Sequence, residues 1–137
     1  MLTEILKPCK ATYDKCAKLV KEGFAVAFPT ETVYGLGANA LSDESIKRIF
    51  EAKNRPCDNP LTVHLADKKD ILLVASEIPS AAEKLIESFM PGPLTILLKK
   101  RKEISALATA GLDTVGVRIP SSAVAKEFIK ACGLPIA

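Results

Sequence analysis

The stretch Phe24-Ala-Val-Ala-Phe28 is a continuous apolar run that ends at Pro29. A run of this length, bounded by a residue that breaks regular structure, predicts a strand buried on both faces. Residues 12–22 precede it with apolar side chains at helical spacing, and Gly23 follows them in the position of a left-handed cap. A predicted amphipathic helix is therefore followed by a predicted buried strand.

Helical and extended patterns continue to mix along the chain. Further helices are predicted from about Asp43, from Ser80 and over 124–132. Ser80 and Glu83 have the spacing of a capping box, with Ser80 as the N-cap. Further strands are predicted over 61–66, 94–98 and 115–119. Because helices and strands do not strictly alternate, the predicted class is α/β, with a twisted, mixed sheet and flanking helices.

The composition fits one globular domain. The 137 residues are 48% hydrophobic and 26% charged, with a net charge of +3, so the chain can bury a core and is not expected to be disordered. No apolar run approaches the roughly 18 residues that cross a bilayer, and the N-terminus lacks a secretory signal pattern. We therefore expect a cytoplasmic protein without membrane contact.

Metal binding and nucleophilic catalysis are not indicated. The four cysteines form no C-x-x-C pair, and the single histidine, His64, has no partner at ligand spacing. There is no G-x-S-x-G elbow, and the carboxylates lie mostly on predicted helix faces, where they are usually solvated. We therefore expect neither a metal site nor a catalytic nucleophile.

Polar and cationic side chains gather near the ends of predicted strands, where α/β sheets usually bind ligands. The segment 29–34 comes directly after the first strand and carries two threonine hydroxyls and a carboxylate, which suit either a small polar ligand or a hydrogen-bonded turn. Lys53, Arg55 and Asn59 share a Pro-bounded loop. That loop fits either a bound polyphosphate or a solvated, basic helix end.

Two charged or ionisable side chains lie within predicted strands. Arg118 interrupts the apolar run 115–119. A buried or half-buried arginine needs an anion, which either a protein carboxylate or a ligand can supply. His64 lies in the strand over 61–66, where a hydrogen-bonded core histidine is the default interpretation.

Two further patterns do not indicate a site. Residues 35–40 match the dinucleotide fingerprint G-x-G-x-x-A, but the glycines come too late after the strand and the helix begins only near Asp43. The basic run 99–102 has no neighbouring aromatic residues for base stacking. A solvated loop is therefore predicted there instead of a nucleic-acid site.

Several longer motifs occur in order along the chain. They are Phe28-Pro-Thr-Glu-Thr-Val-Tyr-Gly-Leu-Gly37, Lys53-Asn-Arg-Pro-Cys-Asp-Asn-Pro-Leu61 with His64, Met90-Pro-Gly-Pro-Leu-Thr95, and Thr114-Val-Gly-Val-Arg-Ile-Pro120. Together they resemble the YrdC-like threonylcarbamoyl-AMP synthases, over residues 23–137. The resemblance implies a twisted α/β sheet with a basic concave face. It also implies a nucleotidyltransferase that joins L-threonine, bicarbonate and ATP into threonylcarbamoyl-AMP and pyrophosphate.

The resemblance also implies partners and residue roles. Thr32, His64 and Arg118 would bind L-threonine, and the ATP-binding residues would be Lys53, Arg55, Asn59 and Thr114. Mg²⁺ would be carried by ATP, and catalysis would come from alignment and charge compensation. The product would pass to a separate threonylcarbamoyl transferase complex that modifies tRNA, and tRNA or double-stranded RNA is a further expected partner.

Members of the family continue after Leu134-Pro-Ile-Ala137 into a Ser-x-Asn motif that binds the nucleotide. Residues 1–137 are therefore expected to form a single YrdC-like domain whose C-terminal part is missing. The alternative function is a non-catalytic RNA- or nucleotide-binding module that uses the same basic face.

Overall fold

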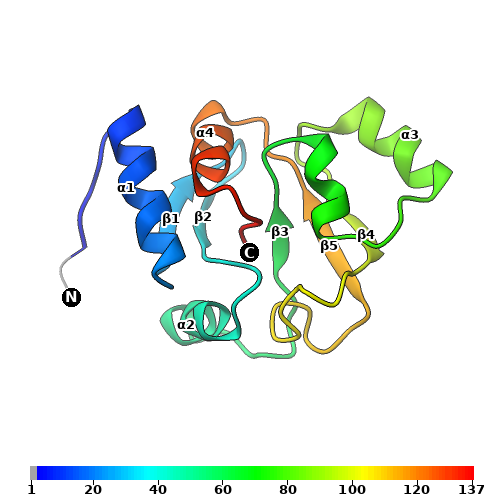
Figure 1. Ribbon diagram of the computed structural model, residues 1–137, viewed down its shortest axis with the longest axis horizontal. Helices are drawn as coiled ribbons and strands as arrows, with labels where there is room; N and C mark the ends of the chain where they lie inside the picture. The colour runs from blue at the N-terminus through cyan, green and yellow to red at the C-terminus, as the bar shows by residue number, and fades with distance from the viewer. Residues whose placement is uncertain (1–2) are drawn as a thin grey trace.

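The structure is a computed structural model that describes residues 3–137, with two small sheets flanked by helices (Figure 1). Its elements are α1 (Lys10–Lys21), β1 (Val26–Pro29), β2 (Tyr34–Gly37), α2 (Asp43–Lys53), β3 (Thr62–His64), the 3₁₀ helix η1 (Lys68–Leu73), α3 (Ser80–Phe89), β4 (Ile96–Lys99), β5 (Thr114–Arg118) and α4 (Ala123–Cys132). Strands β1 and β2 form an antiparallel hairpin. The other sheet has the order β3-β5-β4, with β5 parallel to β3 and antiparallel to β4. The predicted mixed α/β class is confirmed.

Several helix ends follow signals in the sequence. Gly23 comes after α1 with a φ of +91°, a conformation that glycine adopts without steric cost. The Ser42 hydroxyl accepts the Ser45 N–H at the start of α2, and the Ser122 hydroxyl caps α4 in the same way. These caps satisfy backbone N–H groups that the helix itself leaves unpaired.

The region before and at the start of α3 differs from the prediction. Pro79 is the N-cap and Ser80 is the first helical residue, so the predicted capping box is wrong. Pro79 has no side-chain acceptor, and the cap makes no side-chain hydrogen bond. Helix η1 was not predicted; it begins after Asp67, whose carboxylate accepts the Lys69 N–H at 3.2 Å.

The predicted strand over 24–28 is one half of the hairpin. Its partner β2 lies in a stretch for which no strand was predicted. Within β1, Phe28 is buried but Ala27 is exposed, so the prediction of burial on both faces is wrong. The reason is that only the Phe28 side of this two-stranded sheet packs against helices α1 and α4.

Residues 135–137 join the hairpin side of the molecule to the three-stranded sheet, and we call them the seam segment. On one side, Ala137 and Ala38 exchange backbone N–H···O=C bonds at 3.0 and 2.9 Å. On the other side, Ile136 and His64 exchange such bonds at 3.1 and 2.6 Å. Figure 1 shows the segment between β2 and β3. Because it is paired on both sides, it connects the two sheets into one hydrogen-bonded layer.

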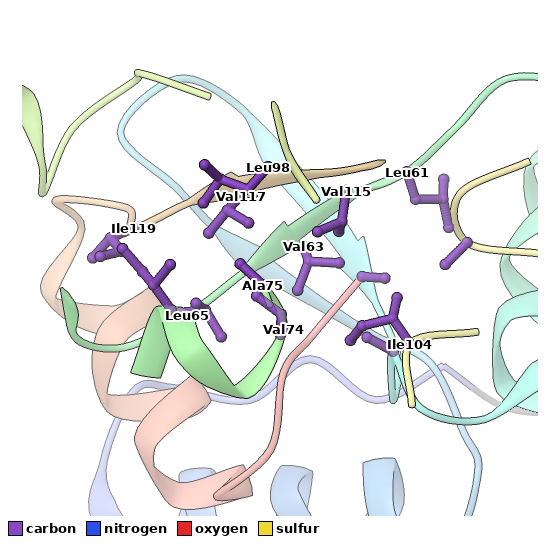
Figure 2. Packing of buried hydrophobic residues seen from close by; sticks show 14 of the residues in the cluster. Leu61, Val63, Leu65, Val74, Ala75, Leu98, Ile104, Val115, Val117 and Ile119 are labelled. Atoms are coloured by element: carbon purple, nitrogen blue, oxygen red, sulfur yellow. The ribbon is translucent and has the colours of Figure 1, made fainter. Parts of the chain in front are cut away.

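The seam segment also contributes to both hydrophobic clusters. Ile136 is fully buried with Phe28 and Phe128 between the hairpin, α1 and α4. Ala137 belongs to the larger cluster around the three-stranded sheet. Figure 2 shows this cluster, which includes Val63, Leu65, Leu98, Ile104, Val115 and Val117. Successive side chains of an extended segment point to opposite faces, so one short segment can serve two clusters.

Gly37 provides the space that the seam segment needs. A Cβ at this position would lie 2.5 Å from Ile136 Cγ2 and 2.6 Å from Phe28 Cε1. We expect Gly37→Ala to lower the free energy of unfolding by about 1–3 kcal/mol, as overpacking does, measured by urea denaturation. Gly35→Ala is the matched control in the same strand, because its Cβ would lie 3.4 Å from Phe28 Cζ. Equal losses in the two variants would contradict this account.

Candidate functional site

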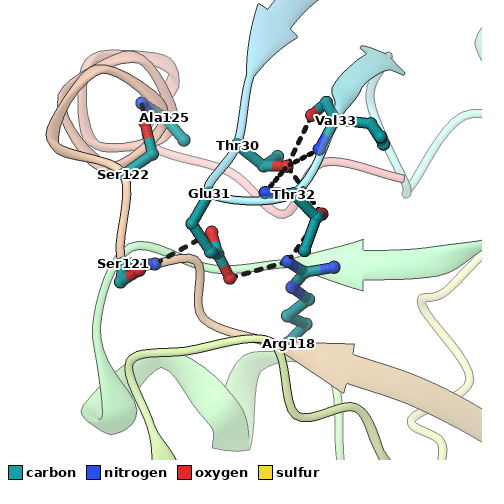
Figure 3. A network of polar contacts seen from close by, with 8 residues as sticks. All are labelled: Thr30, Glu31, Thr32, Val33, Arg118, Ser121, Ser122 and Ala125. Atoms are coloured by element: carbon teal, nitrogen blue, oxygen red, sulfur yellow. Dashed lines mark hydrogen bonds and ion pairs between the residues drawn. The ribbon is translucent and has the colours of Figure 1, made fainter.

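Arg118, the last residue of β5, is held by residues of the hairpin turn (Figure 3). Its Nη2 donates to Glu31 Oε1 at 2.6 Å and to Thr32 Oγ1 at 3.2 Å. Glu31 Oε2 in turn accepts the backbone N–H of Ser121 at 3.2 Å. The side chains of Arg118 and Glu31 are only 15% and 19% exposed. A shielded ion pair therefore ties the turn to the three-stranded sheet.

Thr30 folds the turn that presents Glu31 and Thr32. Its hydroxyl accepts the N–H groups of Thr32 and Val33 at 3.3 and 3.2 Å, and donates to the Val33 carbonyl at 2.5 Å. The hydrogen-bonded turn that the sequence allowed is thus present. Because Thr30 serves the turn, Thr32 is the hydroxyl of this segment that contacts Arg118.

The Glu31–Arg118 pair is charged at neutral pH, yet it leaves one donor unused. Burial is the largest single effect on the pKa of Glu31 and raises it, but hydrogen bonding and the charge of Arg118 outweigh burial and lower this pKa overall. Arg118 Nε is buried and has no hydrogen-bond partner within residues 3–137. An unpaired buried donor costs about 1–3 kcal/mol.

His64 lies beside Arg118 at the ends of the parallel strands β3 and β5. Its half-buried ring packs edge-on against Phe28, with 5.8 Å between the ring centroids and 85° between the planes. Burial, followed by the positive charge of Arg118, lowers the pKa of His64 from 6.5 to about 4. The ring is therefore neutral at pH 7, with one nitrogen that donates and one that accepts.

A second group of candidates lies around the loop after α2. Arg55 donates from Nη2 to Asn59 Oδ1 at 2.7 Å and to the Pro60 carbonyl at 2.8 Å, and from Nε to the Asn59 carbonyl at 3.2 Å. Its guanidinium thus closes its own loop. Lys53 is exposed at the end of α2, immediately before this loop. The structure brings Arg55 and Asn59 together, with the ammonium-bearing Lys53 at the entrance to the loop.

The first group of candidates, around Arg118, and the second group, in the loop after α2, lie at opposite ends of β5. The two valines of this strand are fully buried, so Thr114, Gly116 and Arg118, which alternate with them, face the other side of the sheet. Because His64 is in register with Arg118, the loop that precedes β3 lies at the Thr114 end. At about 3.3 Å per residue, Thr114 and Arg118 are about 13 Å apart. We call this side of the sheet the open face; it carries Thr62, His64, Leu97, Thr114, Gly116 and Arg118.

Ser121 was not singled out from the sequence, and Glu31 was noted only as the carboxylate of the segment after the first strand. The sequence required an anion for Arg118, but the carboxylate that meets it comes from a residue 87 positions earlier. The sequence signal for Glu31 was weak: a carboxylate between two threonines directly after a predicted strand.

Surface hollows of about 490 and 410 Å³ lie elsewhere, along α1 and beside η1, and no candidate residue lines them.

The basic run 99–102 is partly bound to the protein's own backbone. Lys100 Nζ donates to the Ile104 carbonyl at 3.2 Å, and Arg101 Nη1 donates to the Leu72 carbonyl at 3.1 Å.

Within residues 3–137, no three His, Cys, Asp or Glu side chains gather in a way that could hold a metal ion. No helix in this range has both the length and the apolar character to cross a membrane.

His64 should make stability depend on pH. Its pKa is about 4 in the folded protein against an ordinary 6.5, so the unfolded chain binds a proton between these values that the folded chain does not. This stability is fully present above pH 6.5 and is lost as pH falls toward 4. We expect a loss of about 2 kcal/mol in unfolding free energy between pH 7 and pH 5, measured by urea denaturation.

The matched control for this prediction is His64→Gln, which should remove most of the pH difference. Since His64 is the single histidine of the chain, an NMR titration of its ring also reads the pKa directly. A ring that titrates near 6.5, or a pH dependence unchanged in His64→Gln, would contradict the prediction.

Comparison with known proteins identifies relatives of this chain in sequence and in structure. The model of the Sua5, YciO and YrdC proteins, a family described as "Telomere recombination", matches residues 18–137. The threonylcarbamoyl-AMP synthase of Pyrococcus abyssi is 52% identical over 121 residues, which cover 88% of this chain and 36% of that protein. The threonylcarbamoyl-AMP synthase of Bacillus subtilis is 48% identical over 124 residues, covering 90% of this chain and 36% of that protein.

The likeness extends to a solved structure. The crystal structure of Pyrococcus abyssi Sua5 complexed with L-threonine superposes with a TM-score of 0.91 at 48% identity, covering 98% of this chain and 39% of that one. This chain therefore spans little more than a third of the length of these relatives. The matched residues include the hairpin, both groups of candidate residues and the seam segment. On this evidence, the chain belongs to the Sua5/YciO/YrdC family.

Proposed function

We propose that this chain binds L-threonine and ATP on its open face and joins them, with bicarbonate, into threonylcarbamoyl-AMP. The observation that carries the proposal is the separation of two polar groups along β5: a shielded arginine at one end and a basic loop at the other. This arrangement suits one substrate with a carboxylate and another with phosphates. The names of the relatives support it, because two are threonylcarbamoyl-AMP synthases and the Sua5 structure is a complex with L-threonine.

At the Arg118 end, the substrate is the amino acid. Arg118 binds the threonine carboxylate through charge-assisted hydrogen bonds of its guanidinium. The Thr32 hydroxyl and the neutral ring of His64 offer hydrogen bonds to the remaining polar groups of threonine. Glu31 holds the guanidinium in place.

At the Thr114 end, the substrate is the nucleotide. Lys53 supplies a mobile positive charge to the phosphates. Arg55 adds charge and fixes the loop, since its donors already bind Asn59 and Pro60. Asn59 and the Thr114 hydroxyl provide further polar contacts, and Mg²⁺ enters with the triphosphate as its counterion.

The proposed reaction needs no nucleophile from the protein. The threonine amine and bicarbonate give an N-carboxylate and water. An oxygen of this carbamate then attacks the α-phosphorus of ATP, the bond to the bridging oxygen of the β-phosphate breaks, and pyrophosphate leaves. The chain contributes by aligning the carbamate with the phosphorus and by compensating negative charge.

The proposal also covers the rest of the domain and the fate of the product. We infer that the chain belongs to one YrdC-like domain, which a segment with the Ser-x-Asn motif completes on the nucleotide side. The product passes to a threonylcarbamoyl transferase complex that modifies tRNA in the cytoplasm. The basic concave face that the family resemblance implies would be the contact for tRNA or double-stranded RNA.

Removal of Arg118 should weaken threonine binding strongly. The test uses the double variant Glu31→Gln/Arg118→Ala, because loss of the arginine alone would leave a shielded carboxylate unpaired. We expect at least a tenfold loss of affinity for L-threonine by calorimetry, since a charge-assisted bond of this kind contributes about 1.5–3 kcal/mol. Arg101→Ala is the control, as this exposed arginine lies outside both groups. Unchanged affinity in the double variant would remove Arg118 from the site.

Lys53 should contribute to nucleotide binding. We expect Lys53→Ala to weaken ATP binding about threefold to tenfold, because it removes one phosphate-directed charge. Lys47→Ala is a matched control on the same helix, where Lys47 is exposed and pairs only loosely with Glu51 at 3.9 Å. Calorimetric titration with ATP at two salt concentrations measures both. Equal effects of the two substitutions would argue against a specific role for Lys53.

The activity itself is tested by threonine-dependent release of pyrophosphate from ATP and bicarbonate, with threonylcarbamoyl-AMP identified by mass spectrometry. The assay is run on this chain and on a version that includes the Ser-x-Asn segment. Product from either form supports the synthase. Binding of double-stranded RNA without product from either form would favour a non-catalytic binding module.

A further inference from the structure

Glu31 is the negatively charged neighbour of Arg118, and its carboxylate keeps hydrogen-bonding capacity beyond its contacts within the protein (Figure 3). Oε1 accepts from Arg118 Nη2, and Oε2 accepts the backbone N–H of Ser121. Because an ionised carboxylate offers about four lone-pair sites, each oxygen can accept a second hydrogen bond. The side chain is 19% exposed, so it is not sealed off from a ligand.

The guanidinium of Arg118 likewise keeps a donor beside this carboxylate. Both N–H groups of Nη2 are engaged, one by Glu31 Oε1 and one by Thr32 Oγ1. The other terminal nitrogen, Nη1, carries no contact in Figure 3 and does not belong to the buried, unpaired atoms of residues 3–137. Since Nη1 and Nη2 are bonded to the same carbon atom, a ligand carboxylate at Nη1 comes to lie close to the Glu31 carboxylate.

The charges around Arg118 determine which carboxylate ligands are compatible with the site. At neutral pH Glu31 is ionised and His64 is neutral, so the charges of Arg118 and Glu31 cancel before a ligand binds. A ligand that brings only a carboxylate would add a second negative charge beside Glu31, and two neighbouring carboxylates disfavour each other's ionised form. A ligand with an ammonium group next to its carboxylate would instead pair with both members of the ion pair.

We propose that Glu31 selects amino acids among carboxylate ligands by accepting a hydrogen bond from the α-ammonium group, while Arg118 binds the carboxylate. This inference rests on the proposed function and adds a substrate contact to it. In L-threonine the two groups are attached to one carbon atom, so the ligand can bridge the neighbouring donor and acceptor. After carbamate formation the nitrogen still carries one N–H, which can donate to the same oxygen. Glu31 is thus a specificity-determining residue as well as a support for Arg118.

The experiment compares L-threonine with (R)-3-hydroxybutanoate, which is the same molecule without its amino group. Both ligands are titrated by NMR into the full wild-type chain, Glu31→Gln, and the control Glu127→Gln, whose glutamate is exposed on α4. Glutamine keeps an oxygen that can accept from Arg118 but carries no charge. The measured quantity is the ratio of the two affinities, because a general weakening of Arg118 affects both ligands alike.

We expect wild type to bind L-threonine at least tenfold more tightly than the analogue, because it gains a charge-assisted hydrogen bond. Glu31→Gln should lower this ratio by at least about fivefold, since a neutral acceptor bonds an ammonium group less strongly. Glu127→Gln should leave the ratio as in wild type.

The alternative is that Glu31 only holds the guanidinium in place. Glu31→Gln would then weaken both ligands by the same factor and leave the ratio unchanged. A smaller preference in wild type, or a smaller fall of the ratio in Glu31→Gln, overturns the inference while the proposed function stands. If the wild-type chain does not bind L-threonine, the proposed function fails and the inference falls with it.

Circular dichroism and urea denaturation establish whether Glu31→Gln is folded. If it is not, the same ratio is measured with Glu31→Asp, which keeps the negative charge for Arg118 but withdraws the carboxylate by one methylene group. The ratio should again fall, by at least about threefold, because the acceptor no longer reaches the ammonium group at hydrogen-bond distance. A smaller fall overturns the inference.

Discussion

The backbone pairing of residues 135–137 with a segment on either side is the constraint on which the rest of the structure depends. The candidate threonine site draws Glu31 and Thr32 from the hairpin turn, and His64 and Arg118 from the three-stranded sheet. These two sheets are separate ladders that the seam segment connects. The same segment bonds directly to the backbone of His64. The distance of 2.6 Å between Arg118 Nη2 and Glu31 Oε1 therefore depends on this pairing as much as on the two charges.

Electrostatics at the site follows from that geometry. Arg118 is shielded, and Glu31 compensates its charge while leaving Nε without a partner among residues 3–137. Burial, and after it the positive charge of Arg118, lowers the pKa of His64, so the site holds one positive charge and not two at neutral pH. A carboxylate ligand then finds a preoriented arginine, and a neutral imidazole can still donate or accept a hydrogen bond. The cations of the second group lie at the other end of β5, where the proposed nucleotide would place its phosphates.

Local patterns in the sequence predicted much of the fold. Apolar spacing located α2 and α4, and short apolar runs located β3 and β5, because these signals act over a few residues. The hairpin was predicted less well, because β2 contains two glycines and follows a polar turn that hides its extended character. Ser80 was assigned the wrong role because Pro79 takes the N-cap position.

The sequence predicted that Arg118 needs an anion, but the choice of Glu31 depends on tertiary pairing, which no local pattern encodes. The sequence also could not show that the candidate residues form two groups at opposite ends of β5, because this depends on the register of β3 with β5.

The most direct test of the central claim is amide hydrogen exchange measured by NMR under native conditions. The informative amides are those of Ala38, His64 and Ile136, whose partners lie across the seam. They should exchange as slowly, within about tenfold, as the Leu65 amide, which bonds to the Arg118 carbonyl inside the three-stranded sheet. Fast exchange of all three while Leu65 stays protected would show that the two sheets are not held together by the seam segment, and would contradict the account.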